Sequence, residues 1–206
     1  MRLLLIRHGQ TPGNVLGQLD TAFPGPGLTE LGTRQAEILA TTLSGSGVDA
    51  LYASKLLRAQ LTAAPLSRAK GVEVQVSEGL HEIGAGDLEL RADRESIHRY
   101  LETVYAWGLG DLDAKMPGGD DGHEFFGRFD ADIAAMADSG AEVAAAVSHG
   151  AAIRVWASSR ARNVLPSFGA ENALDNTGIV TLEGSTATGW TLVEWAGTPV
   201  DPGTPG

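Results

Sequence analysis

Cysteine is absent from the 206-residue sequence. This absence excludes disulfide bonds, thiolate metal sites and every mechanism that uses a cysteine nucleophile, including that of the cysteine-dependent phosphatases. The five histidines are scattered, without the i, i+4 spacing that is typical of a metal site. We therefore expect neither a metal ion nor a cofactor.

Basic residues are also few, with 15 Lys and Arg against 26 Asp and Glu and a formal net charge of −11. Sequence-independent binding to nucleic acid needs clustered Lys and Arg against the phosphates. The acidic balance therefore predicts no nucleic-acid partner, and it mainly supports solubility.

Long apolar runs are missing as well. No segment approaches the ~20 apolar residues that cross a bilayer. The apolar start is interrupted by Arg2 and ends at Arg7, so it lacks the core of a signal peptide. We expect a cytoplasmic protein without a membrane partner, present as a monomer or homodimer, and the chain length suits one domain.

Strand and helix patterns alternate along the chain, which is typical of an α/β fold with a mainly parallel sheet. Strands are expected at residues 2–6, 49–53, 72–76, 143–148, 179–183 and 190–195. Helices are expected from an N-cap at Thr29 to a stop at Gly45, from Ser54 to a kink or end at Pro65, and at 94–107, 121–138 and 151–160. The Gly- and Pro-rich residues 197–206 are expected to be a disordered tail, which leaves 1–196 as a single domain.

An arginine and a histidine stand where the first expected strand ends, in LLLIRHGQT at residues 3–11. A neutral imidazole is a good nucleophile, and a guanidinium can hold a phosphate dianion through two parallel N–H bonds. A bare Arg–His pair is more often a solvent-facing strand end. In this context, Arg7 and His8 predict a nucleophile beside the group that binds its anionic substrate.

Two other strands deliver similar groups at their carboxyl ends. Arg58 follows the strand that ends near Ala53, and His149–Gly150 follow VAAAVS and open the next helix. Open α/β sheets bind their ligands at this edge, and a helix N-terminus offers backbone N–H groups to an anion. The three strand ends therefore predict one shared phosphate site.

These motifs resemble the histidine phosphatase superfamily, also called the phosphoglycerate mutase-like family. The resemblance rests on LIRHGQT, the Arg58 segment and VSHG, and it extends to LTELGTRQA (28–36), LHEIGAGDLE (80–89), PGGDD (117–121) before Arg128 and, weakly, N-x-x-x-N-T-G-I (172–179). It covers roughly residues 1–183. It implies a three-layer αβα fold and an enzyme that acts on a small phosphate ester.

The resemblance also implies roles for the matching residues. His8 would accept the phosphoryl group as phosphohistidine, and Glu82 would protonate the leaving oxygen and then activate water. His81 could tune this acid electrostatically if the two side chains lie on one side of the chain. The implied catalytic set is Arg7, His8, Arg58, Glu82 and His149, and the implied phosphate-binding set is Arg7, Asn14, Arg58, His149 and Gly150.

Phosphatase and mutase share this nucleophile, so the residues around it must separate them. The resemblance implies that members of the mutase branch are longer chains, with paired arginines in an insertion and a tyrosine three residues after the acid. This sequence has Ala85 at that position. Residues 108–122 offer only Lys115. We therefore favour a phosphatase and keep a cofactor-dependent mutase as the alternative. A non-catalytic phospholigand-binding module is a third reading, disfavoured because the catalytic set is complete.

Several loops depart from the family pattern. Leu88 and Leu90 replace the usual aromatic residue and glycine after the acid, and GGDD at 118–121 replaces GGES. Gln18 and Asp20 lie closer to Asn14 than the family loop residues do, so neither is assigned a contact. These loops choose the substrate, whose identity therefore stays open.

Overall fold

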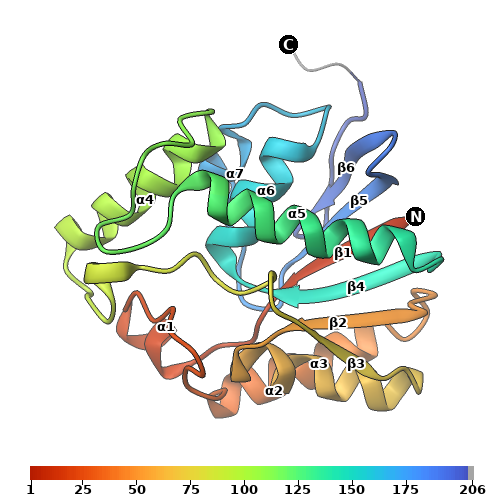
Figure 1. The fold of residues 1–206 in the computed structure, drawn as a ribbon. Coiled ribbons are helices and arrows are strands. Elements are labelled where there is room, and N and C mark those ends of the chain that lie inside the picture. Colours follow the sequence, from red (N-terminus) through yellow and green to blue (C-terminus); the bar gives the residue numbers. More distant parts are fainter. Residues whose placement is uncertain (204–206) are drawn as a thin grey trace.

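The computed structural model describes residues 1–203, which form one mixed sheet with helices on both faces (Figure 1). Within this range the sheet has seven strands in the order β3-β2-β4-β1-β5-β6-β7. The strands are β1 (Arg2–Arg7), β2 (Ala50–Ser54), β3 (Val74–Ser77), β4 (Val143–Ser148), β5 (Ile179–Ser185), β6 (Gly189–Trp195) and β7 (Thr198–Pro199). β3, β2, β4 and β1 are parallel to one another, while β5, β6 and β7 pair antiparallel. The expectation of a mainly parallel central sheet is confirmed.

Helices cover the two faces of this sheet. They are α1 (Pro12–Leu16), α2 (Glu30–Thr42), α3 (Leu57–Lys70), η1 (Gly86–Leu88), α4 (Arg94–Gly108), α5 (Gly122–Asp138), α6 (Gly150–Arg160) and α7 (Phe168–Glu171). α2 and α3 lie on one face, and α4, α5 and α6 lie on the other (Figure 1). The three-layer αβα architecture is therefore confirmed.

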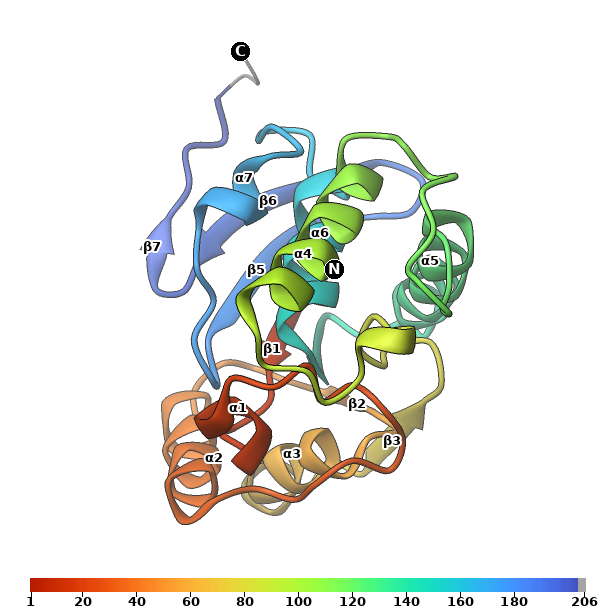
Figure 2. The same cartoon turned by 90° about the vertical axis from the view of Figure 1, so that its left-hand side faces the viewer.

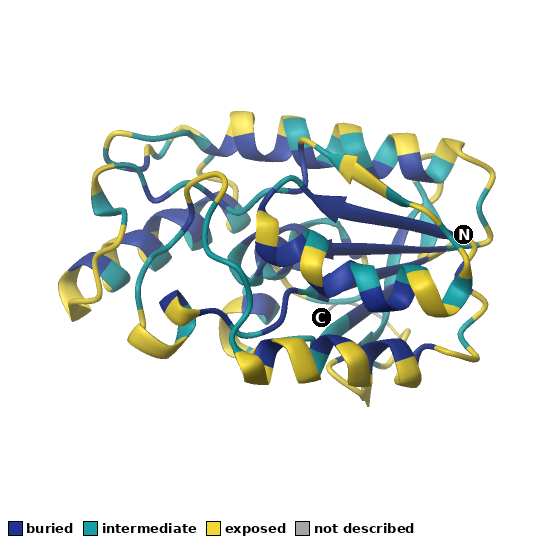
Figure 3. Cartoon of the chain, turned by 90° about the horizontal axis from the view of Figure 1, so that it is seen from below, coloured by how far each residue is buried: buried dark blue, intermediate teal, exposed yellow. Residues whose placement is uncertain are grey.

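The side chains of β1 show why helices pack against both faces of the sheet. Leu3 and Leu5 belong to the core under α4, α5 and α6, while Leu4 and Ile6 belong to the core over α2 and α3. Successive side chains of a strand point to opposite faces, so a strand buried on both sides reads as a continuous apolar run. Figure 3 shows the central strands buried along most of their length, and the helices with one buried and one exposed face.

The helix boundaries follow local chemistry. Thr29 caps α2 as expected, because its side chain accepts from the N–H of Gly32. The helix ends at Thr42, shortly before the expected stop at Gly45. Pro65 was expected to kink or end the next helix, and it does not end it, since α3 continues to Lys70. Pro65 is buried between the buried Ala63 and Leu66, and this packing offsets the lost helical hydrogen bond.

The expectation of a disordered tail from residue 197 is wrong for the first part of that segment. Thr198 and Pro199 pair with Trp195 and Glu194 as β7, and the N–H of Val200 donates to the carbonyl of Val193 at 2.9 Å. Main-chain hydrogen bonds to the edge of the sheet fix these residues whatever their composition. Residues 204–206, also assigned to the tail, lie outside the described range.

Within the described range, no helix combines the length and the apolar character that spanning a membrane would require.

Candidate functional site

The carboxyl ends of β1, β2 and β4 bring three sequence-distant segments together. In the parallel pair β1–β4, Arg7 lies opposite Ser148, so His8 and His149 follow side by side. Their ring centroids are 5.1 Å apart, well inside the ~10 Å that a shared phosphate allows. Figure 2, turned so that the left side of Figure 1 faces the viewer, looks onto this edge of the sheet.

His8 is held as a neutral imidazole. The residue is 4% exposed, and Nδ1 of its ring lies 2.8 Å from the carbonyl oxygen of Gly9. Because a carbonyl oxygen only accepts, Nδ1 carries the proton and Nε2 keeps its lone pair. Nε2 in turn accepts from Nε of Arg58 at 3.2 Å. Burial, followed by the charges of Arg58 and Arg7, lowers the pKa of His8 well below its usual value.

His149 is fully buried and is neutral for the same reasons. Its Nδ1 accepts from Nε of Arg58 at 3.3 Å, and its Nε2 lies 2.8 Å from the hydroxyl of Ser54. Burial and the charge of Arg58 lower the pKa of His149 well below the usual value. One N–H of Arg58 therefore lies between the two imidazoles. His149 does not line the cavity beside His8, so its contact with a phosphoryl oxygen stays a prediction.

Arg58 is 2% exposed and lies under the loop that contains FPGPG. Its Nη2 donates to the carbonyl of Asp20 at 3.1 Å. A Cβ on Gly25 would lie 2.6 Å from Nη1, and Gly25 has a φ of +68°, so this position requires glycine. Burial lowers the pKa of Arg58, while the charges of Glu82 and Asp20 oppose the shift.

Arg7 is anchored beside the start of α6. Its Nη1 donates to the carbonyl of Leu174 at 2.6 Å, and a Cβ on Gly150 would lie 3.1 Å from its Nε. Burial lowers the pKa of Arg7, and Glu82 opposes this effect. Within residues 1–203, Nε of Arg7 and Nη1 of Arg58 are buried without a hydrogen-bond acceptor. Each arginine thus keeps one buried donor unused.

Glu82 occupies the N-terminus of α6. Its carboxylate accepts from the N–H groups of Ala151 at 3.2 Å and Ala152 at 2.9 Å, and from its neighbour Ile83 at 2.9 Å. We expected these helix N–H groups to face an anionic ligand, and that expectation is wrong for the first turn beyond Gly150. A carboxylate is itself an anion that the N-terminus of a helix stabilises, so Glu82 takes the place.

These residues surround a cavity of about 180 Å³. Of the expected site residues, Arg7, His8, Asn14, Arg58, Glu82 and Gly150 line it. Asn14 also closes the capping box of α1, since its Oδ1 accepts from the N–H of Thr11 at 3.1 Å. Gln18 and Asp20, which received no assignment from the sequence, line the cavity too. Burial raises the pKa of Asp20, against the charge of Arg58.

Sequence reasoning missed other residues of the cavity wall: Thr11, Leu19, Thr21, Tyr100, Leu101, Ala151, Arg154 and Leu174. Arg154 had a usable signal, because it follows Gly150 by four residues and so shares its helix face. Its Nε donates to the carbonyl of Gly169 at 2.7 Å. Tyr100 had no such sequence signal, because α4 reaches the site only through tertiary packing.

Comparison with known proteins supplies an independent view. The family model described as the histidine phosphatase superfamily (branch 1) matches residues 3–198. The chain is 39% identical to the PE-PGRS family protein PE_PGRS11 of Mycobacterium tuberculosis over 96% of this chain and 36% of that protein. It is 36% identical to the adenosylcobalamin/alpha-ribazole phosphatase of Salmonella typhimurium over 62% of each. The chain therefore spans less than two thirds of both relatives.

Solved structures match over nearly their whole length. A mycobacterial glucosyl-3-phosphoglycerate phosphatase in complex with VO3 superposes with a TM-score of 0.80 and 25% identity, covering 96% of this chain and 99% of that one. The alpha-ribazole phosphatase of Shigella flexneri superposes with a TM-score of 0.76 and 27% identity, covering 98% and 100%. Both match the sheet and helix arrangement described above.

Proposed function

Because the chain belongs to branch 1 of the histidine phosphatase superfamily, we propose that it is a metal-independent phosphomonoesterase that acts through a phosphohistidine on His8. The state of His8 carries this proposal. The ring is buried and neutral, it is oriented by the carbonyl of Gly9, and its Nε2 lone pair lies against Arg58. Relatives and structural neighbours that are themselves phosphatases support a hydrolase.

In the first step, Nε2 of His8 attacks the phosphorus, and the bond from phosphorus to the leaving oxygen breaks. The phosphoryl oxygens gather charge that the guanidinium groups of Arg7 and Arg58 stabilise, since both arginines line the cavity. Nδ1–H of His8 keeps its bond to Gly9, so the positive charge that forms on the ring stays hydrogen-bonded.

Glu82 serves both halves of the reaction. In the first, its protonated form gives a proton to the leaving oxygen, so the product departs as an alcohol. In the second, its carboxylate takes a proton from the water that attacks phosphorus, and the N–P bond breaks to release phosphate and neutral His8.

The cavity limits what the enzyme can enclose. Its volume of about 180 Å³ is below the roughly 300–1,000 Å³ of pockets that enclose a drug-sized ligand. The site therefore encloses the phosphoryl group and a short part of the leaving group. Gln18, Asp20 and Arg154 supply polar contacts there, which suits a small phosphorylated metabolite.

The test is to trap the intermediate. Nitrophenyl phosphate labelled in its phosphoryl group is mixed with excess enzyme in EDTA and quenched with alkali, because phosphohistidine survives alkali and hydrolyses in acid. We expect acid-labile label on the wild-type chain and none on His8→Ala. Label on the His8→Ala chain, or turnover that EDTA abolishes, would refute the proposal. Transfer of the label from the chain to a hydroxyl group of an added alcohol, with no phosphate released, would indicate the mutase alternative.

A further inference from the structure

The segment that carries Glu82 has no regular secondary structure, yet side chains hold every one of its carbonyl groups. Residues 79–83 lie between β3 and η1. Their carbonyl oxygens accept from side chains of three elements: Gly79, His81 and Glu82 from Arg128, Leu80 from Ser148, and Ile83 from Tyr100. A loop fixed in this way is as rigid as the side chains that hold it.

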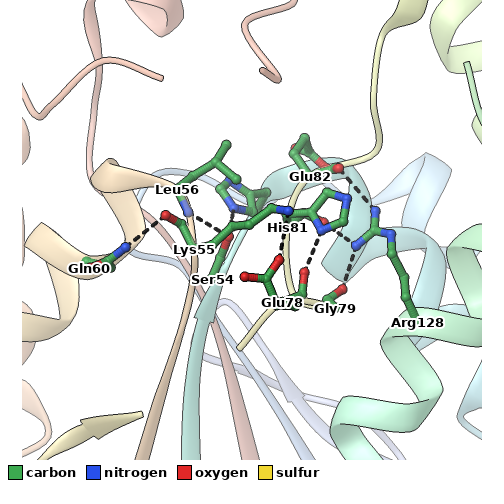
Figure 4. A network of polar contacts seen from close by, with 10 residues as sticks. Ser54, Lys55, Leu56, Gln60, Glu78, Gly79, His81, Glu82 and Arg128 are labelled. Carbon is green, nitrogen blue, oxygen red and sulfur yellow. Dashed lines mark hydrogen bonds and ion pairs between the residues drawn. The ribbon is translucent and has the colours of Figure 1, made fainter. Parts of the chain in front are cut away.

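Arg128 provides most of that support. It lies on α5, and Figure 4 shows its guanidinium reaching across to the segment. Nη1 donates to the carbonyls of Gly79 and His81, the latter at 2.7 Å, and Nη2 donates to that of Glu82 at 3.1 Å. A hydrogen bond from a charged donor is stronger than a neutral one, so these three contacts are expected to dominate the fixing of the loop.

Within residues 1–203, the hydrogen bonds that the Arg128 side chain makes all go to this segment. The guanidinium lies over the ring of Phe125, with 5.3 Å from Cζ to the ring centroid. Gly79 touches the α5 backbone so closely that a Cβ there would lie 2.2 Å from the carbonyl oxygen of Arg128. Helix and loop are therefore packed directly together at this point, and the arginine spans their contact.

His81 takes no part in holding the carboxyl group of Glu82. Its Nδ1 lies 2.6 Å from the carbonyl of Glu78, and Glu78 in turn pairs with Lys55 at 2.8 Å (Figure 4). These contacts tie His81 to Glu78, the exposed residue just before the segment. The end that bears the acid is held by Arg128 and by the N–H groups of α6.

We propose that Arg128 is a positioning residue for the proton-donating acid, which it holds in place by clamping the carbonyls of residues 79, 81 and 82. The inference rests on the proposed role of Glu82. Arg128 does not line the cavity beside His8, and it fixes the backbone from which the carboxyl group would reach the leaving oxygen. Misplacing a catalytic group by about 1 Å costs on the order of 100-fold in rate.

The experiment compares Arg128→Met with wild type in single-turnover phosphorylation of His8. A nitrophenolate leaves without a proton, whereas an alkoxide needs one. We expect Arg128→Met to slow the reaction of glycerol phosphate roughly 10- to 100-fold and that of nitrophenyl phosphate only a few-fold. Arg128→Lys keeps the charge but not the geometry of the three hydrogen bonds, so its rate with glycerol phosphate should lie between those of wild type and Arg128→Met. This variant replaces Arg128→Met in the test if the methionine variant folds poorly.

The control is Arg160→Met. Arg160 also stacks on a phenylalanine of α5, with Cζ 4.3 Å from the ring centroid of Phe126, but it pairs with Asp130 and contacts none of the clamped carbonyls. It should slow both substrates equally or not at all. In the Glu82→Gln background, Arg128→Met should add no further difference between the substrates.

Equal slowing of the two substrates by both Arg128 variants would overturn the positioning role. So would a full additional effect of Arg128→Met in the Glu82→Gln background. A wild-type chain that forms no phosphohistidine at all would instead refute the proposed function, which keeps the two failures apart.

Discussion

Two buried neutral histidines should make this fold sensitive to mild acid. The pKa values of His8 and His149 lie well below the usual value in the folded chain, while in the unfolded chain they return to about 6.5. As pH falls below about 6.5, the unfolded state binds protons that the folded state cannot, so stability is present above that pH and is lost as pH falls.

The size of the loss follows from proton uptake by the unfolded chain. For one histidine with an unfolded pKa of about 6.5, lowering the pH from 7.0 to 5.5 favours the unfolded state by about 1.3 kcal/mol. His8 and His149 together should cost about 2.5 kcal/mol. This is a large fraction of the free energy of unfolding of a whole domain, which is typically about 5–15 kcal/mol.

Urea unfolding at the two pH values, in phosphate-free buffer, measures this loss. His8→Gln and His149→Gln should each reduce the loss between pH 7.0 and 5.5 by about 1.3 kcal/mol, because each removes one group that titrates on unfolding. His98→Gln, at an exposed position on α4, is the control for replacing a histidine outside the site. If both buried variants retain the full wild-type pH dependence, the histidines take up protons in the folded state and the reasoning is wrong.

Three other outcomes are expected. Glu82→Gln should slow single-turnover phosphorylation of the enzyme far more with an alkyl phosphate than with nitrophenyl phosphate, and equal slowing would argue against an acid at this position. Arg7→Ala and Arg58→Ala should each lose about 2–4 kcal/mol of transition-state stabilisation, measured from kcat/KM; near-wild-type values would place the arginines outside the reaction. Gly32→Ala should lower the free energy of unfolding by about 1–3 kcal/mol, because its Cβ would lie 2.1 Å from the carbonyl oxygen of Gln10; an unchanged denaturation midpoint would show that the backbone yields without cost.

The sequence was most informative where one local rule decides the structure. The apolar run before Arg7 could only be a strand buried on both faces, and the polar residues after it had to emerge at the carboxyl edge. The same rule placed Arg58 and His149 there. Glu82 was located only by the family resemblance, since its loop has no periodicity.

Other features depend on contacts that no local pattern contains. The capture of the α6 N-terminus by Glu82 depends on a hydrogen bond between residues 82 and 152. Pro65 stays helical because of what packs around it, and β7 forms because an edge strand offers it main-chain partners. α1 and α7 are five and four residues long, too short to show a helical period.

The parallel pairing of β1 with β4 has a consequence for the order in which the chain folds. Residues 2–7 and residues 143–148 are far apart in the sequence. Their pairing stabilises the fold only after the entropy cost of closing the long loop between them has been overcome. No contiguous fragment that lacks either end of that loop can assemble the two imidazoles. On refolding from denaturant, helical signal should therefore return first, and turnover should reappear only with the last kinetic phase, when the first strand enters the centre of the sheet.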